Sequence, residues 1–185
     1  MNKFGWILVL ALLACPAIAG ETSFWIEPQV VYNKEKSLSR IDAGLSGNIA
    51  ESIGYFAFGQ ALSNGYSQLY GGPNWKPLSW LEVGVGVGAE SVKPSLRRSA
   101  YFLATEGKVS ALGIYENGGS GRFRKLVATY QITESLKLGV MSETYLGFGP
   151  RVEYAVTKSI SLWGAVLRDH ESQTTNAVFA TTINF

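Results

Sequence analysis

Beyond the first twenty residues the sequence has no cysteine, a single histidine and no long hydrophobic run. Without cysteine, that part of the chain has no disulfide, no thiolate nucleophile and no thiolate metal site. The lone histidine, His170, leaves the usual zinc ligand sets incomplete, so we expect no bound metal. No sequence motif calls for a cofactor either. A transmembrane helix needs about 20 consecutive apolar residues, and no such segment follows the N-terminal region.

Charge is also scarce. Charged residues make up 16% of the sequence, whereas soluble domains usually have about 25%. The formal net charge is only +2, which gives no basis for binding nucleic acid. In contrast, the sequence has 21 glycines and 12% aromatic residues. This composition, without apolar runs, indicates a chain that meets lipid through alternate residues.

The segment 1–19 has the pattern of a secretory signal peptide. A short basic start precedes the apolar run Phe4–Ala14, which is too short for a transmembrane helix. Ala17-Ile18-Ala19 then supplies small residues at the positions that a signal peptidase reads. Cys15 lies in a poor lipobox. We therefore expect cleavage before residue 20 without lipid attachment, and one domain over 20–185.

The dominant hydrophobic period in that domain is two, which is typical of β-strands. In the segment 81–90, one face carries Leu and Val, while the other carries Glu82, Gly84, Gly86, Gly88 and Glu90. The same alternation recurs at 40–49, 136–143, 149–156 and 176–185. A lipid-facing barrel strand and a soluble sandwich strand both alternate in this way, so the period alone leaves the two open.

Connections between strands recur at regular intervals. Five short polar turns are expected at Glu51-Ser52, Pro77–Ser79, Glu106–Lys108, Thr133–Ser135 and Thr157–Ser159. Six slightly longer loops are expected at Asn33–Ser39, Ser63–Ser67, Ser91–Leu96, Asn117–Gly121, Thr144–Gly149 and Asp169–Thr175. Eleven connections predict twelve strands. Ten strands is the rival count, because 66–76 is interrupted by Gly and Pro and 108–116 alternates poorly.

The C-terminal segment favours a membrane barrel over a soluble sandwich. Phe185, preceded at alternate positions by Ile183 and Phe179, resembles the assembly signal of Gram-negative outer-membrane β-barrel proteins. Aromatic residues also gather near the expected strand ends, as in interfacial girdles. The fold class predicted is thus all-β, a closed antiparallel transmembrane barrel with short periplasmic turns and short extracellular loops.

This resemblance to outer-membrane barrels covers essentially the whole domain. It implies a location in the outer membrane with both termini periplasmic, and contact with outer-membrane lipid, lipopolysaccharide and the barrel-assembly machinery. A monomer is favoured. Twelve-stranded monomeric channels, such as the oligogalacturonate-specific porins, have the nearest architecture. Their lumens are strongly basic and this sequence is not, so their acidic-sugar substrate is not carried over.

Three carboxylates each precede a loop, and each is followed by an arginine on the next strand. Glu90 is followed by Arg97 and Arg98, Glu116 by Arg122 and Arg124, and Glu143 by Arg151, and we take Arg97, Arg124 and Arg151 as the mouth charges. Neighbouring strands of a hairpin place such residues side by side. If the charges stay separated, they create a transverse field across a water-filled mouth. If they pair, they neutralise each other and fix the strand register.

The sequence is compatible with three functions. The first is a narrow passive channel for small polar solutes, with Gly84, Gly86 and Gly88 facing the lumen. The second is a non-conducting structural or surface-binding barrel, whose lumen is packed by Trp25, Phe56, Phe58, Tyr70, Tyr101 and Trp163. The third is a lipid-modifying hydrolase centred on His170, because His170-Glu171-Ser172 resembles the H-x-S spacing of lipid A deacylases. The strand that follows lacks the carboxylate that such enzymes need, so we expect no enzyme.

Overall fold

The computed structural model describes residues 22–185. The predicted signal peptide, its cleavage site and Cys15 lie outside the described residues and stay predictions. Twelve strands follow one another along the chain. They are β1 (Thr22–Tyr32), β2 (Ser37–Asn48), β3 (Ile53–Leu62), β4 (Ser67–Leu78), β5 (Leu81–Glu90), β6 (Leu96–Glu106), β7 (Val109–Gly118), β8 (Gly121–Gln131), β9 (Leu136–Glu143), β10 (Gly147–Ala155), β11 (Ile160–Arg168) and β12 (Thr175–Asn184).

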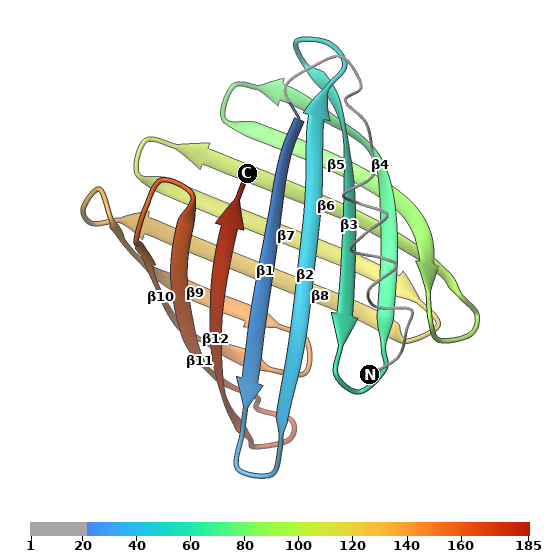
Figure 1. Cartoon of the computed structure of the whole chain (residues 1–185), viewed down its shortest axis with the longest axis vertical. Helices are drawn as coiled ribbons and strands as arrows, with labels where there is room; N and C mark the ends of the chain where they lie inside the picture. The colour runs from blue at the N-terminus through green and yellow to red at the C-terminus, as the bar shows by residue number, and fades with distance from the viewer. Residues whose placement is uncertain (1–21) are drawn as a thin grey trace.

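The strands form one closed antiparallel barrel (Figure 1). Each strand pairs with its neighbours in sequence, and β1 pairs with β12 to close the sheet. The predicted count of twelve is therefore confirmed, and the rival count of ten is wrong. The two segments that favoured ten strands form β4 and β7. In β4 the irregularity is local: the register with β5 shifts between Trp75 and Leu78, around Pro77, which has no N–H to donate.

Each of the five predicted turns and six predicted loops falls at a connection between two strands, but most are shorter than predicted: of Asn117–Gly121, for example, only residues 119 and 120 lie outside β7 and β8. Successive strands run in opposite directions, so the turns gather at one end of the barrel and the loops at the other (Figure 1). We call these the turn end and the loop end. The two ends of the described chain meet at the turn end, where the Phe185 N–H donates to the carbonyl oxygen of Phe24 over 2.9 Å.

The outer face of the barrel is apolar and exposed. Val85 and Val87 on β5 are 59% and 62% exposed, and Phe179 on β12 is 63% exposed. A soluble protein rarely leaves so continuous an apolar surface in water, whereas a transmembrane barrel turns it to lipid. The alternation is thus apolar-out, opposite to that of a soluble sandwich. Among the described residues, no helix is long and apolar enough to cross a bilayer.

The interior is filled unevenly. An apolar core lies under β1, β9, β11 and β12, and consists of Val31, Met141, Trp163, Ala165, Leu167, Val178 and Ala180. A row of aromatic rings in tilted and edge-to-face contact lines β1, β3, β4 and β6. Its successive ring centroids are 4.8–6.3 Å apart, in the order Trp25, Phe58, Tyr70, Phe56 and Tyr101. The remaining interior surface is polar and charged.

Candidate functional site: the polar interior of the barrel

One guanidinium lies between two carboxylates near the loop end of β5, β6 and β7. Arg97 Nη1 is 3.1 Å from Glu90 Oε2, and Arg97 Nη2 is 2.5 Å from Glu116 Oε2. None of the three side chains is more than 3% exposed. Charges removed from water in this way are stable only when they are paired and hydrogen-bonded. We call this group the Arg97 cluster.

Hydroxyl groups satisfy the remaining oxygen atoms of the Arg97 cluster. Tyr70 on β4 donates to Glu116 Oε1 over 2.6 Å. Tyr66, in the loop before β4, donates to Glu90 Oε2 over 2.8 Å, and Ser120 donates to the same carboxylate. Burial raises the pKa of Tyr66 to about 12. The Tyr66 hydroxyl therefore stays protonated and acts as a donor.

A second cluster crosses the barrel. Arg40 on β2 contacts Glu143 on β9 over 2.6 Å, although five strand-to-strand steps separate these strands around the sheet. Lys125 on β8 lies 3.6 Å from the same carboxylate. Gln29 accepts from Arg40 and donates to Asp42, which ties the group to β1. This Arg40 cluster bridges opposite walls, and its central ion pair is at most 6% exposed.

Of the three predicted charge pairs, the structure brings together the first. Glu90 and Arg97 are in contact across the β5–β6 hairpin, as neutralised partners rather than as separated charges. Glu116 does not meet Arg124, because the β7–β8 register sets Arg124 opposite Tyr115. A shift of one residue reverses the face of a strand, so Arg124 points outward. Glu116 pairs with Arg97 instead.

The third predicted pair is also replaced. Glu143 contacts Arg40 and Lys125 rather than Arg151. Arg151 does face the lumen, where it binds Glu153 over 3.0 Å. Its guanidinium carbon lies 3.8 Å from the centroid of the Trp163 ring, in cation–π geometry. The prediction from hairpin spacing missed the contact between Glu143 and Arg40, because it considers only adjacent strands. In a narrow barrel, long side chains also reach across the lumen.

The three glycines of β5 face inward as predicted, but they do not open the lumen. A Cβ atom at Gly84 would lie 2.2 Å from the Tyr101 ring, and one at Gly88 would lie 2.0 Å from the Leu69 carbonyl oxygen. Gly86 similarly faces Ser99 and the Phe56 ring. These glycines make room for aromatic rings and for a close approach of backbones.

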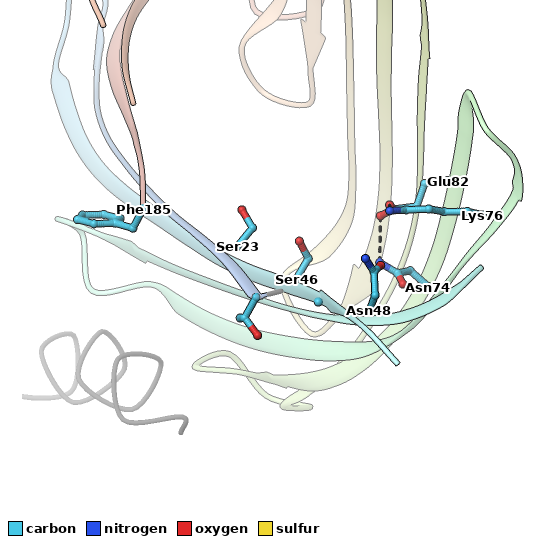
Figure 2. Close-up of a pocket in the computed structure, with 9 residues that line it drawn as sticks. Ser23, Ser46, Asn48, Asn74, Lys76, Glu82 and Phe185 are labelled. Atoms are coloured by element: carbon cyan, nitrogen blue, oxygen red, sulfur yellow. Dashed lines mark hydrogen bonds and ion pairs between the residues drawn. The ribbon is translucent and has the colours of Figure 1, made fainter. Parts of the chain in front are cut away.

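A cavity of about 350 Å³ opens at the turn end (Figure 2). Lys76 and Glu82 lie on one side, with Lys76 Nζ 3.6 Å from Glu82 Oε2. Asn74 donates to Glu82 Oε1 over 3.0 Å. Ser23 and Ser46 lie on the other side, as Figure 2 shows. The turn end is therefore a polar vestibule, while the loop end is crossed by buried side chains.

The charges of the lumen nearly cancel. Among the described residues they comprise seven carboxylates and six cations. These are Glu27, Asp42, Glu82, Glu90, Glu116, Glu143 and Glu153, and Arg40, Lys76, Arg97, Lys125, Lys137 and Arg151. An interior of this kind favours neither anions nor cations strongly.

Sequence reasoning missed Arg40, Asp42 and Lys125 as interior charges. A signal was present for two of them, because Arg40 and Asp42 alternate with apolar residues on β2. Glu143, the partner of Arg40 across the barrel, was itself predicted at the mouth, but nothing in the sequence links it to Arg40. Two residues separated by 103 positions have no pattern in one sequence that links them.

His170 lies in the exposed loop between β11 and β12. The Ser172 hydroxyl donates to Asp169 and contacts Thr174, and no hydrogen bond joins it to the imidazole. The hydrogen bond from the Ser172 hydroxyl lowers the pKa of the Asp169 carboxyl group. The loop thus has the contacts of a surface turn, without a Ser–His pair. Residues 22–185 contain no group of His, Cys, Asp and Glu arranged to hold a metal ion.

The closed twelve-stranded barrel, apolar outside and polar within, is the fold of small outer-membrane porins. Solved structures similar to it include the KdgM porin, with a TM-score of 0.62 and 13% identity over 87% of this chain and 99% of that chain. The NanC porin has a TM-score of 0.54 and 10% identity over 85% and 98% of the two chains. Omp33, an outer-membrane protein of Acinetobacter baumannii, has a TM-score of 0.50 and 10% identity over 90% and 98%. No family model matches the chain, and no curated protein sequence does.

Proposed function

We propose that the protein is a narrow outer-membrane channel for small polar solutes, closed in this conformation by the Arg40 and Arg97 clusters. The carrying observation is the ion pair between Arg40 and Glu143, which joins opposite walls of the barrel. A purely structural interior has no need of buried charge, since apolar side chains of similar volume are often equally or more stabilising. The likeness of the fold to that of porins also supports a channel.

The passing solutes are small and carry little net charge. One solved structure similar to this one shows the KdgM porin with oligogalacturonate, an acidic sugar polymer. The lumen described above has one carboxylate more than it has cations, so it offers no excess of positive charge to attract such a polymer. Neutral or zwitterionic solutes fit the near-cancelling charges, and weak ion selectivity follows for the same reason.

Planar-bilayer conductance tests the channel. The double variant R40Q/E143Q removes the cross-lumen ion pair and leaves the net charge of the cluster unchanged, although one cation, Lys125, and one carboxylate, Asp42, each lose a partner. We expect brief openings from the wild-type barrel and openings at least severalfold longer from this variant. The control is K137Q/E153Q, which removes a pair between adjacent strands, β9 and β10, whose contact is 3.0 Å. If correctly folded wild-type and R40Q/E143Q barrels both fail to conduct, the channel proposal is wrong.

A non-conducting barrel is the second candidate. The observation that favours it is the filling of the interior by the apolar core under β1, β9, β11 and β12 and by the row of aromatic rings. All six aromatic residues that this interpretation requires point inward. In that case R40Q/E143Q stays silent in the bilayer, and the exposed loops carry the function by contacting a partner.

The proposal includes the place of the protein in the cell. A signal peptide of residues 1–19 would direct export, and the barrel would enter the outer membrane as a monomer with both termini periplasmic. Phe179, Ile183 and Phe185 lie at alternate positions and would be read by the barrel-assembly machinery. Phe185 is 74% exposed and packs on Phe24, so its ring is accessible at the rim of the turn end.

A further inference from the structure

The outer wall of the barrel carries few charges, and they are sorted by end. Among the described strand residues that face outward, four arginines lie near the loop end and one carboxylate, Glu106, lies near the turn end. The arginines are Arg98, Arg122, Arg124 and Arg168. Their direction follows from their neighbours: Arg97 and Lys125 pair inside the lumen, so the adjacent residues on the same strands point out.

Three of these arginines form a compact group. Arg98 on β6 and Arg122 on β8 both stand opposite Asn117 on the intervening strand β7. Two strand spacings separate them, which is about 10 Å. Arg124 follows Arg122 by two residues, about 7 Å along β8, and stands opposite Tyr115. We call Arg98, Arg122 and Arg124 the arginine triangle.

The arginine triangle lies at the edge of the apolar band. On β6, Arg98 and Glu106 are eight residues apart, with Ala100, Phe102 and Ala104 between them on the outer face. Eight residues of strand span about 26 Å, and the strand tilt of about 35–45° reduces this to about 20 Å along the membrane normal, a few ångströms less than an apolar band about 25 Å tall. Arg98 and Glu106 therefore stand near the two borders of the band, and the long Arg98 side chain reaches the lipid headgroups.

The guanidinium groups of the arginine triangle are exposed, and within residues 22–185 no ion pair holds any of them. In contrast, the interior arginines Arg40 and Arg97 are each paired with carboxylates. The fourth outward arginine, Arg168, donates to Thr175 and Gln173. The arginine triangle is thus a group of positive charges that no carboxylate of the described residues neutralises.

We infer that the arginine triangle binds the phosphorylated headgroup of a lipid in the leaflet at the loop end. Guanidinium groups bind phosphate in a bidentate manner, and three of them surround one position on the wall. The acyl chains of the same lipid would lie against Phe102 and Leu126, directly below the arginines. This apolar contact favours a lipid over a free phosphate ion. The inference rests on the proposed membrane location but not on conduction.

Lipid retention by the folded barrel tests this inference. The full barrel is reconstituted in phosphatidylcholine nanodiscs with a small fraction of diphosphorylated lipid A, and retained lipid is measured by native mass spectrometry. We expect the triple variant R98Q/R122Q/R124Q to lower the affinity by about tenfold to a hundredfold, because each arginine near an anionic surface contributes to binding. R168Q is the matched control and should change the affinity less than about twofold, since single exposed charges contribute little.

Two further measurements on the wild-type barrel show whether the bound phosphate belongs to a lipid headgroup or to a free ion. Lipid A without its phosphates should be retained far less by the wild-type barrel, and millimolar inorganic phosphate should not displace the diphosphorylated lipid. Equal retention of both lipids, or equal retention by the triple variant and R168Q, would overturn the inference. Displacement by inorganic phosphate would show a small-anion site instead. A barrel that conducts but fails these measurements refutes this inference alone, and one that does not enter nanodiscs refutes the proposed location.

Discussion

The Arg97 cluster allows a quantitative test of the interior. In the variant R97Q, Glu90 and Glu116 lose their only charged partner within the described residues, while both stay buried. Removing one member of a buried ion pair typically costs about 3 to 5 kcal/mol, because the remaining charge is left uncompensated. Here two carboxylates are left, so we expect the upper part of that range. Tyr66, Tyr70 and Ser120 still donate to them, which prevents a larger loss.

The free energy of unfolding is measured by denaturant titration of the barrel in lipid vesicles, followed by tryptophan fluorescence. The variant R168Q is the control and should change this free energy by less than about 0.5 kcal/mol, since Arg168 is exposed. The triple variant E90Q/R97Q/E116Q removes every charge of the group and should recover part of the loss, with a coupling of about 0.5 to 3 kcal/mol. An R97Q barrel that loses less than about 1 kcal/mol would refute the assigned burial and pairing.

Three further outcomes are expected. Gly88→Ala should lower the free energy of unfolding by about 1 to 3 kcal/mol because its Cβ would meet a backbone oxygen, whereas Gly164→Ala has room and should be near neutral in the same titration. Deleting Phe185 should reduce the amount of heat-modifiable barrel in gel-shift assays of membranes, and normal insertion would contradict the assembly-signal interpretation. Intact mass of the exported protein should show an unlipidated chain that begins at residue 20, and a lipid-modified Cys15 would contradict it.

The strands could be predicted from the sequence because the side chains of a barrel strand face lipid and lumen in turn. Apolar and polar or small residues therefore alternate along the chain. The apolar face of β5 and the turns before β3, β9 and β11 were readable from local order alone. Closure between β1 and β12 was expected from the resemblance to outer-membrane barrels, and the even count agrees with it, since an antiparallel sheet with no free edge needs an even number of strands.

The interior contacts could not be predicted in the same way. The Glu90–Arg97 pair spans one short hairpin, so local spacing was enough. The contact between Arg40 and Glu143 depends on the diameter of the barrel and on how far two long side chains extend. Arg124 shows a different limit: the β7–β8 connection contains fewer residues than expected, and that difference sets its face.

The apolar core under the β1–β12 closure has a consequence for folding. Glu27 on β1 accepts from Trp163 and from Thr182, which lie 136 and 155 residues away in sequence. Val31 and Val178 meet in the same core. The apolar core is therefore completed only when the last strand arrives, and chains rich in such distant contacts fold slowly. A nascent barrel without β12 has an open seam and lacks Val178 and Ala180 from its core, so we expect the final pairing step to be the step that commits the chain to its folded state.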